Sequence, residues 1–264
     1  MSSEPAKYYL DHKDEFFMEY GHETLVKKLK PCLPHMGDKP ILSLDLGSNV
    51  GNYFETIHKL CPERNHTVLA FEPNPINLPM LETNAKKYNN VIVYNQAVSN
   101  TPGILPFHNY STRHENMPGN TIAALRGGGA FISNVNVTTV DAVLQPFPNH
   151  LVKFVKIDTE GNDTNVIRGM QKNLHRTCYI IFECSDCLDD HRGPNEVDPM
   201  RKVVEFLDTH NFNTYRIGTK RLIQVNGNGW DPVYEQVKYH SNCFAIKKND
   251  PCITDLIDAN GFYK

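Results

Sequence analysis

The 264 residues include 27 lysines and arginines and 30 aspartates and glutamates, which gives a formal net charge of -3 at pH 7. A composition of 40% hydrophobic and 22% charged residues is ordinary for a globular protein and argues against disordered and fibrous classes. Proteins that neutralise nucleic-acid phosphates are usually strongly basic, so we expect no nucleic acid among the partners.

The length of the chain fits one hydrophobic core, so we expect a single domain over residues 1–264. No run of 18 apolar residues is present, and we expect no membrane span. The N-terminus is charged where a signal peptide is apolar, and the seven scattered cysteines fit a reducing compartment. These features predict a cytoplasmic protein. Cys184, Cys187 and His191 have zinc-like spacing, but no second ligand pair follows them.

Short β-branched runs alternate with helical stretches along the chain, which predicts an α/β fold with helices covering a parallel sheet. An N-terminal helical region, 1–40, comes first and contains an amphipathic helix. The helices are expected at 16–29, 53–61, 77–88, 164–174 and 199–210. The strands are expected at 41–46, 68–71, 91–94, 154–157, 179–182, 214–217 and 243–246.

Residues 99–136 break this alternation with three prolines, three consecutive glycines and many polar residues. Long irregular segments in compact domains are usually functional lids or passive loops. We interpret this segment as a lid inserted on the acceptor side of the site, with a passive loop as the alternative.

A glycine-containing turn, Asp-Leu-Gly-Ser-Asn-Val-Gly at 45–51, directly follows the first strand and precedes a helix, which is the context of a nucleotide-binding turn. Gly47 permits a backbone angle that side chains disfavour, and Gly51 allows close packing of helix on strand. Asn49 replaces the second glycine of a dinucleotide fingerprint. The turn therefore disfavours a nicotinamide oxidoreductase, which remains a rival interpretation.

An acid, Glu72, directly follows the second expected strand. It lies 21 residues after Gly51. An acid at this position can accept hydrogen bonds from both ribose hydroxyls of a nucleoside. A surface glutamate before a proline turn is the alternative.

Two carboxylates, Asp158 and Glu160, follow the expected strand at 154–157, and Glu183 follows the next one. Open α/β sheets bind ligands at this edge. Like charges this close should raise the pKa of one carboxyl group, which suits proton transfer. Structural caps or ion pairs would also explain these acids.

The order of these motifs resembles the FkbM family of methyltransferases. The resemblance implies a Rossmann-like class I methyltransferase fold, with a seven-stranded, mostly parallel sheet and helices on both faces. It also implies S-adenosyl-L-methionine as cofactor and O-methylation of sugars or secondary metabolites. The matching blocks are 45–51, 70–75 with Leu81 and Asn84, 96–99, 139–141, 156–161 and 166–169.

Carried over block by block, the resemblance implies a cofactor pocket. Its expected members are Asp45, Gly47, Ser48, Asn49, Gly51, Glu72, Pro73, Asn74, Gln96, Ala97 and Asp158. Ser48 stands where the family usually has alanine. Gln96 and Ala97 are expected to contact the adenine, and Gln96 occupies a place where many methyltransferases have an acid.

The expected acceptor is a hydroxyl on a carbohydrate or small molecule, which needs a base to remove its proton. Asp158 is the first candidate and Glu160 the second, with the histidines 108, 114 and 191 as alternatives. Asp158, Glu160 and Glu183 could instead hold Mg²⁺, because this ion prefers oxygen ligands. A catalytically silent cofactor-binding protein and a nucleic-acid methyltransferase remain as alternatives.

Overall fold

The computed structural model describes residues 3–16, 18–34, 38–110, 119–121, 130–183, 200–236 and 241–264. Contacts divide these residues into two compact units. Unit 1 comprises the described residues in 3–34, 179–183 and 200–264, and unit 2 comprises those in 38–178. No helix in the described ranges is long and apolar enough to cross a bilayer.

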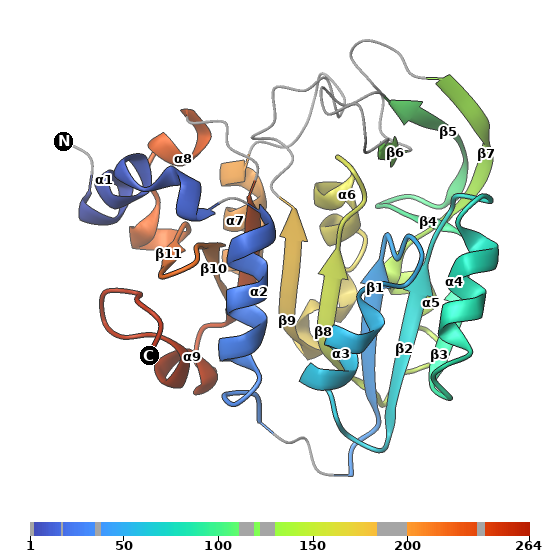
Figure 1. Cartoon of the computed structure of the whole chain (residues 1–264), viewed down its shortest axis with the longest axis horizontal. Coiled ribbons are helices and arrows are strands. Elements are labelled where there is room, and N and C mark those ends of the chain that lie inside the picture. The colour runs from blue at the N-terminus through green and yellow to red at the C-terminus, as the bar shows by residue number, and fades with distance from the viewer. Residues whose placement is uncertain are drawn as a thin grey trace. The chain divides into compact units, whose positions relative to one another are not determined.

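Unit 2 is built on four parallel strands, which are β1 (Ile41–Leu46), β2 (His66–Phe71), β3 (Val91–Tyr94) and β8 (Leu151–Ile157). Their order is β8-β1-β2-β3. β1 pairs with β8 on one side and β2 on the other, so all its side chains are buried. The arrows of β1, β2 and β8 end at the same edge (Figure 1), and the candidate site residues follow these ends.

Helices cover both faces of this sheet in Figure 1, where α3 lies in front and the 3₁₀ helix η2 lies behind. The elements are α3 (Phe54–Leu60), α4 (Leu78–Ala85), α5 (Val140–Val143), α6 (Asp163–Arg168) and η2 (Gln171–Arg176). The single helix expected at 164–174 is thus two elements. They meet at Gly169, where a Cβ atom would lie 2.1 Å from the carbonyl oxygen of Ser99.

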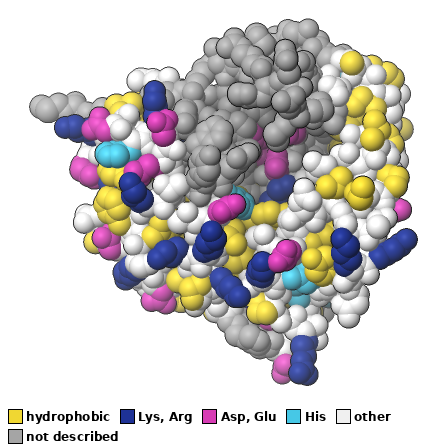
Figure 2. All heavy atoms as spheres, in the orientation of Figure 1, with side chains coloured by type: hydrophobic (Ala, Val, Ile, Leu, Met, Phe, Trp, Pro, Cys, Tyr) yellow, Lys and Arg dark blue, Asp and Glu magenta, His cyan; other side chains and the backbone are white. Residues whose placement is uncertain are grey.

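The segment expected to be irregular, 99–136, contains strands in its described part. They form a second sheet in the order β4-β7-β5-β6. Its strands are β4 (Ala97–Val98), β5 (Gly103–Tyr110), β6 (Gly119–Thr121) and β7 (Ala130–Thr138). Phe107 and Val135 belong to its small core, while Ile104 is 69% and Phe131 60% exposed. Hydrophobic side chains also gather at the right edge of the face in Figure 2.

Unit 1 contains four strands in the order β11-β10-β12-β9, and the pairs β10–β11, β10–β12 and β9–β12 are antiparallel. The strands are β9 (Thr177–Glu183), which enters unit 1 at Tyr179, β10 (Phe212–Ile217), β11 (Leu222–Gln224) and β12 (Asn242–Lys247). The helices are α1 (Glu4–Asp11), η1 (Lys13–Phe16), α2 (Met18–Leu29), α7 (Met200–Thr209), η4 (Gly227–Gly229), α8 (Val233–Gln236) and α9 (Cys252–Leu256).

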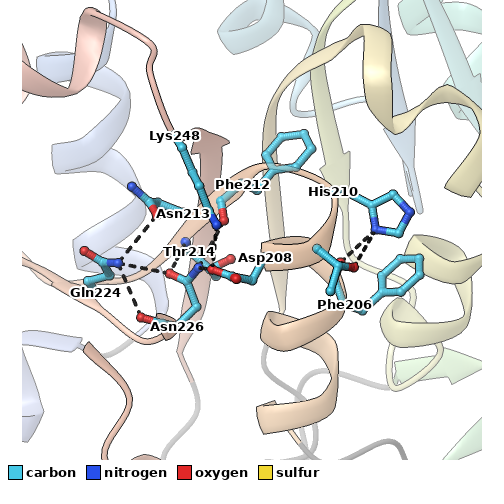
Figure 3. A network of polar contacts seen from close by, with 10 residues as sticks. Phe206, Asp208, His210, Phe212, Asn213, Thr214, Gln224, Asn226 and Lys248 are labelled. Atoms are coloured by element: carbon cyan, nitrogen blue, oxygen red, sulfur yellow. Dashed lines mark hydrogen bonds and ion pairs between the residues drawn. The ribbon is translucent and has the colours of Figure 1, made fainter. Parts of the chain in front are cut away.

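A buried amide joins α7 to β10 in unit 1 (Figure 3). The Asn226 side chain donates to Asp208 Oδ1 at 2.5 Å and to the carbonyl oxygen of Phe212 at 3.0 Å, and accepts from the Thr214 amide at 2.9 Å. Lys248 Nζ lies 3.2 Å from Asp208 Oδ1. This network satisfies polar groups that would otherwise be buried without partners.

The sequence predicted seven strands for the main sheet, and the described residues contain eight. These are β1, β2, β3 and β8 in unit 2 and β9, β10, β11 and β12 in unit 1. The additional strand is β11, whose three residues are too few for hydrophobic periodicity to identify. The α/β class is confirmed.

Candidate active site

The turn after β1 requires its glycines. Gly47 and Gly51 have φ values of 84° and 85°, and Asn49 has a φ of 50°. A Cβ atom on Gly47 would lie 1.8 Å from the carbonyl oxygen of Asp158. The turn after β1 therefore packs directly on the end of β8, with room for a backbone but not for a side chain.

Ser48 links this turn to the end of β2 by hydrogen bonds. Its hydroxyl donates to the carbonyl oxygen of Asp45 at 2.8 Å and accepts from the amide of Phe71 at 3.1 Å. The backbone amides of Gly47 and Ser48 both donate to the carbonyl oxygen of Phe71. An alanine would lack the two side-chain bonds, so the serine adds a link between neighbouring strands.

Glu72 is a buried acid that closes the turn from the side of β2. Its Oε2 atom accepts from the amide of Asn49 and its Oε1 atom from the amide of Asn74, both at 2.8 Å. Burial raises the pKa of Glu72 to about 7, although these two amides favour the charged form. A carboxylate has about four lone-pair sites, so acceptor capacity remains for ligand hydroxyls.

A lysine joins two carboxylates at the carboxyl ends of β1 and β8. Lys156 Nζ lies 3.5 Å from Asp45 Oδ1 and 3.4 Å from Asp158 Oδ2, and donates to the carbonyl oxygen of Gly47 at 2.7 Å. Asp45 is fully buried, whereas the side chain of Asp158 is 41% exposed. Burial raises the pKa of Asp45, and the charge of Lys156 opposes that shift.

The turn after Asp158 is held by a second buried acid. Asp163 Oδ2 accepts from the amide of Thr159 at 3.1 Å and from its hydroxyl at 2.8 Å. Between them, Glu160 and Gly161 have φ values of 56° and 95°. Non-glycine residues rarely adopt such a φ. The two bonds to Asp163 therefore stabilise an unfavourable backbone conformation at the half-buried Glu160.

A family model for the methyltransferase FkbM domain matches residues 45–217, more than half of the chain. The chain belongs to the FkbM methyltransferase family.

One solved structure agrees with this fold and with the class I methyltransferase architecture. The FkbM methyltransferase of Methylobacillus flagellatus KT is similar with a TM-score of 0.51 and 12% identity, over 91% of this chain and 50% of that one. The chain therefore spans about half the length of that protein. None of the curated proteins searched matches this chain.

Two further solved structures are similar with TM-scores below 0.5. A precorrin-6y C5,15-methyltransferase of Geobacter metallireducens GS-15 has a TM-score of 0.40 and 15% identity, over 89% of this chain and 96% of that one. A Streptococcus mutans protein described as a methyltransferase and solved with SAH has a TM-score of 0.46 and 13% identity, over 88% and 99%.

In this FkbM-family chain, most of the sequence-predicted residues gather around the ends of β1, β2 and β8. Gln96 and Ala97 follow β3, where Gln96 is half-buried and Ala97 pairs with Val137 of β7. Pro73 lies between the ordered Glu72 and Asn74. The adenine contacts of Gln96 and Ala97 stay predictions.

The remaining predicted residues belong to other elements or lie outside the described residues. Glu183 ends β9 in unit 1 and is buried there. His108 lies half-buried on β5, with its ring centroid 6.1 Å from that of Phe131. His114, His191 and the cysteines 184 and 187 lie outside the described residues, as do parts of the expected lid. The described ranges contain no group of three residues able to hold a metal ion.

The sequence did not predict a role in the site for two residues of this FkbM-family chain, Lys156 and Asp163. Side chains two residues apart on a strand share one face, so the spacing of Lys156 and Asp158 could have identified the lysine. Asp163 follows the strained turn and no comparable periodic signal precedes it. Its role depends on a backbone shape that sequence does not display.

Proposed function

We propose that this chain transfers a methyl group from S-adenosyl-L-methionine to a hydroxyl of a sugar, a glycan or a small hydroxylated metabolite. The observation that carries the proposal is the hydrogen bond from the Asn49 amide to the carboxylate of Glu72 at 2.8 Å. In dinucleotide sites, the corresponding turn approaches a pyrophosphate. Here the amide already has an anionic partner from the chain itself.

The charge balance of the site supports a cationic cofactor. Asp45, Glu72 and Asp158 gather around the turn after β1, and Lys156 is the basic group in contact with two of them. Three acids against one base leave negative charge when the acids are ionised. A pyrophosphate would be repelled there, whereas the sulfonium of S-adenosyl-L-methionine would be attracted.

The residues present also fit the rest of the cofactor. Glu72 keeps acceptor capacity for the ribose hydroxyls. When bound, the cofactor supplies an electrophilic methyl carbon on its positively charged sulfur. The proposed cofactor residues are those expected from the resemblance.

Asp158 is the proposed general base, because its partly exposed carboxylate follows β8 at the edge where α/β sheets bind ligands. Asp158 would take up the hydroxyl proton as the acceptor oxygen bonds to the methyl carbon and the carbon–sulfur bond breaks, with S-adenosylhomocysteine as the leaving group. Glu160 is the second candidate. Most of the rate must come from holding the acceptor oxygen in line with the methyl carbon.

A small or carbohydrate acceptor suits the charge of the chain better than a nucleic acid. The formal net charge is -3. On the described part of the face in Figure 2, positive and negative side chains are mixed. Neither feature provides the cationic surface that phosphate neutralisation requires.

Calorimetry with S-adenosyl-L-methionine, S-adenosylhomocysteine and NAD⁺ tests the cofactor. We expect micromolar binding of the first two and none of NAD⁺; tight NAD⁺ binding would overturn the proposal. Mass spectrometry after incubation with labelled cofactor and a panel of glycans and hydroxylated metabolites tests the acceptor. A parallel incubation with chelator tests the route through a divalent metal.

A further inference from the structure

Lys156 occupies a position in unit 2 from which one ammonium group reaches three parts of the site. The residue lies opposite Asp45 in the β1–β8 register. Its Nζ contacts the carbonyl oxygen of Gly47 and both neighbouring carboxylates, Asp45 and Asp158, at 2.7 to 3.5 Å. The contact with Gly47 is a hydrogen bond, and the contacts with the two carboxylates are ion pairs.

The carboxylate of Asp45 depends on this lysine. Asp45 is fully buried, and within the described residues neither of its oxygens accepts a hydrogen bond. A buried carboxylate without a counter-charge is strongly destabilising in its ionised form. Burial acts to lower the pKa of Lys156, but the carboxylates of Asp158 and Asp45 outweigh it and raise that pKa. Lys156 is therefore a permanent cation.

We propose that Lys156 is a positioning residue that fixes the carboxylate of Asp158 against the cofactor turn and sets how strongly the site prefers a cationic ligand over a neutral one. The inference rests on the proposed function. A positive charge beside two acids weakens their attraction for a sulfonium. In methyl transfer the positive charge leaves the sulfur. A site that attracts the bound cation more strongly than the transition state would therefore raise the activation barrier of the transfer.

The substitution Lys156→Met removes the charge and keeps a long side chain, while Lys156→Arg keeps the charge. Calorimetry of each variant with S-adenosyl-L-methionine and with neutral-sulfur S-adenosylhomocysteine gives the ratio of the two affinities. We expect this ratio to rise by about fivefold or more in Lys156→Met, since a unit charge is lost near the acids, and to stay within about twofold in Lys156→Arg. A merely structural role would weaken both ligands alike.

The matched control is Lys59→Met, because Lys59 is an exposed lysine of α3 that pairs with Glu55 one helical turn away. It should leave the ratio at the wild-type value. A ratio in Lys156→Met equal to that of wild type, with both ligands binding, would overturn the inference. If Lys156→Met fails to fold, Lys156→Gln replaces it with the same expectation.

A ligand-free measurement separates this inference from the proposed function. The ionisable groups that act on Asp45 are Lys156, Asp158, Glu72 and Tyr53. Without Lys156, ionised Asp45 loses its counter-charge, so Lys156→Met should lower the Tm more at pH 8 than at pH 5. Equal losses at both pH values refute the electrostatic role. Wild-type protein that binds neither ligand refutes the proposed function, while the Tm comparison still decides the role of Lys156.

Discussion

Glu72 accepts a hydrogen bond from the backbone amide of Asn49, 23 residues earlier in the chain, at 2.8 Å. This bond joins the end of β2 to the turn after β1. The same carboxylate also accepts from the amide of Asn74 at 2.8 Å. One buried acid therefore holds two backbone amides and retains acceptor capacity for a ligand.

Replacing Glu72 with glutamine should weaken S-adenosyl-L-methionine binding by at least about tenfold. The amide keeps the size of the side chain but halves its acceptor oxygens, and charge-assisted hydrogen bonds contribute about 1.5–3 kcal/mol each. Isothermal titration measures the change, with circular dichroism as the test of folding. Unchanged affinity in a folded Glu72→Gln variant would remove Glu72 from the cofactor site.

Cofactor affinity should depend on pH through Glu72, whose pKa burial raises to about 7. The ionised form accepts ribose hydroxyls, so affinity should fall about tenfold between pH 8 and pH 6. Glu72→Gln should lack this dependence, and titrations of both proteins across that range make the comparison. A wild-type profile as flat as that of the variant would contradict the assignment.

The same shift makes a prediction about the ligand-free protein. Because the folded-state pKa lies above the ordinary value of 4.5, the contribution of Glu72 to stability is fully present below pH 4.5 and is lost as pH rises through about 7. Glu72→Gln should therefore gain stability relative to wild type as the pH is raised from 5 to 8, which urea unfolding at several pH values can measure.

Asp158→Asn should lower kcat by about 10² or more and change cofactor affinity by less than about tenfold. The amide keeps most hydrogen bonds but cannot take up the proton of the acceptor. Kinetics on the identified acceptor measure the rate of methyl transfer, and calorimetry measures the cofactor affinity. A near-normal kcat would move the base to Glu160 or to a histidine, and lost cofactor binding would place Asp158 in the cofactor pocket instead.

Lys153→Met should destabilise the protein by about 3–5 kcal/mol, because it removes one member of a buried ion pair with Glu63. Both side chains are only 1% exposed. The control is Lys59→Met, whose exposed pair with Glu55 contributes about 0.3–0.5 kcal/mol. Chemical denaturation compares the two variants. Similar small losses in both would show that the buried pair adds no net stability.

Gly47→Ala should destabilise the fold by about 2–5 kcal/mol, since the new Cβ combines a left-handed backbone with a clash at Asp158. Gly103→Ala is the matched control, because a Cβ there has no neighbour within 4 Å. The control should stay within about 1 kcal/mol of wild type. Thermal or urea unfolding of the two variants gives the difference, and equal stabilities would mean that the turn can move away from β8.

Local patterns in the sequence predicted the parallel half of the fold well. The apolar run at 41–46 coincides with β1, and the runs at 91–94 and 68–71 lie on β3 and within β2. Buried parallel strands need apolar side chains on both faces, so their signal is strong. β11 has only three residues, and β5 and β7 alternate irregularly around a bulge at Phe107 and His108. Their pairing depends on contacts distant in sequence.

Local sequence patterns were enough to predict which acids reach the carboxyl edge of the sheet, since Asp45, Glu72 and Asp158 each end or follow a recognisable apolar strand. The contacts that these acids make could be seen only in the folded chain. The fold brings the carbonyl of Gly47 and the acids of β1 and β8 around Lys156, and it turns Glu72 onto the amide of Asn49. Strand periodicity is a local property, whereas hydrogen bonds, desolvation and charge pairing depend on groups that only folding brings together.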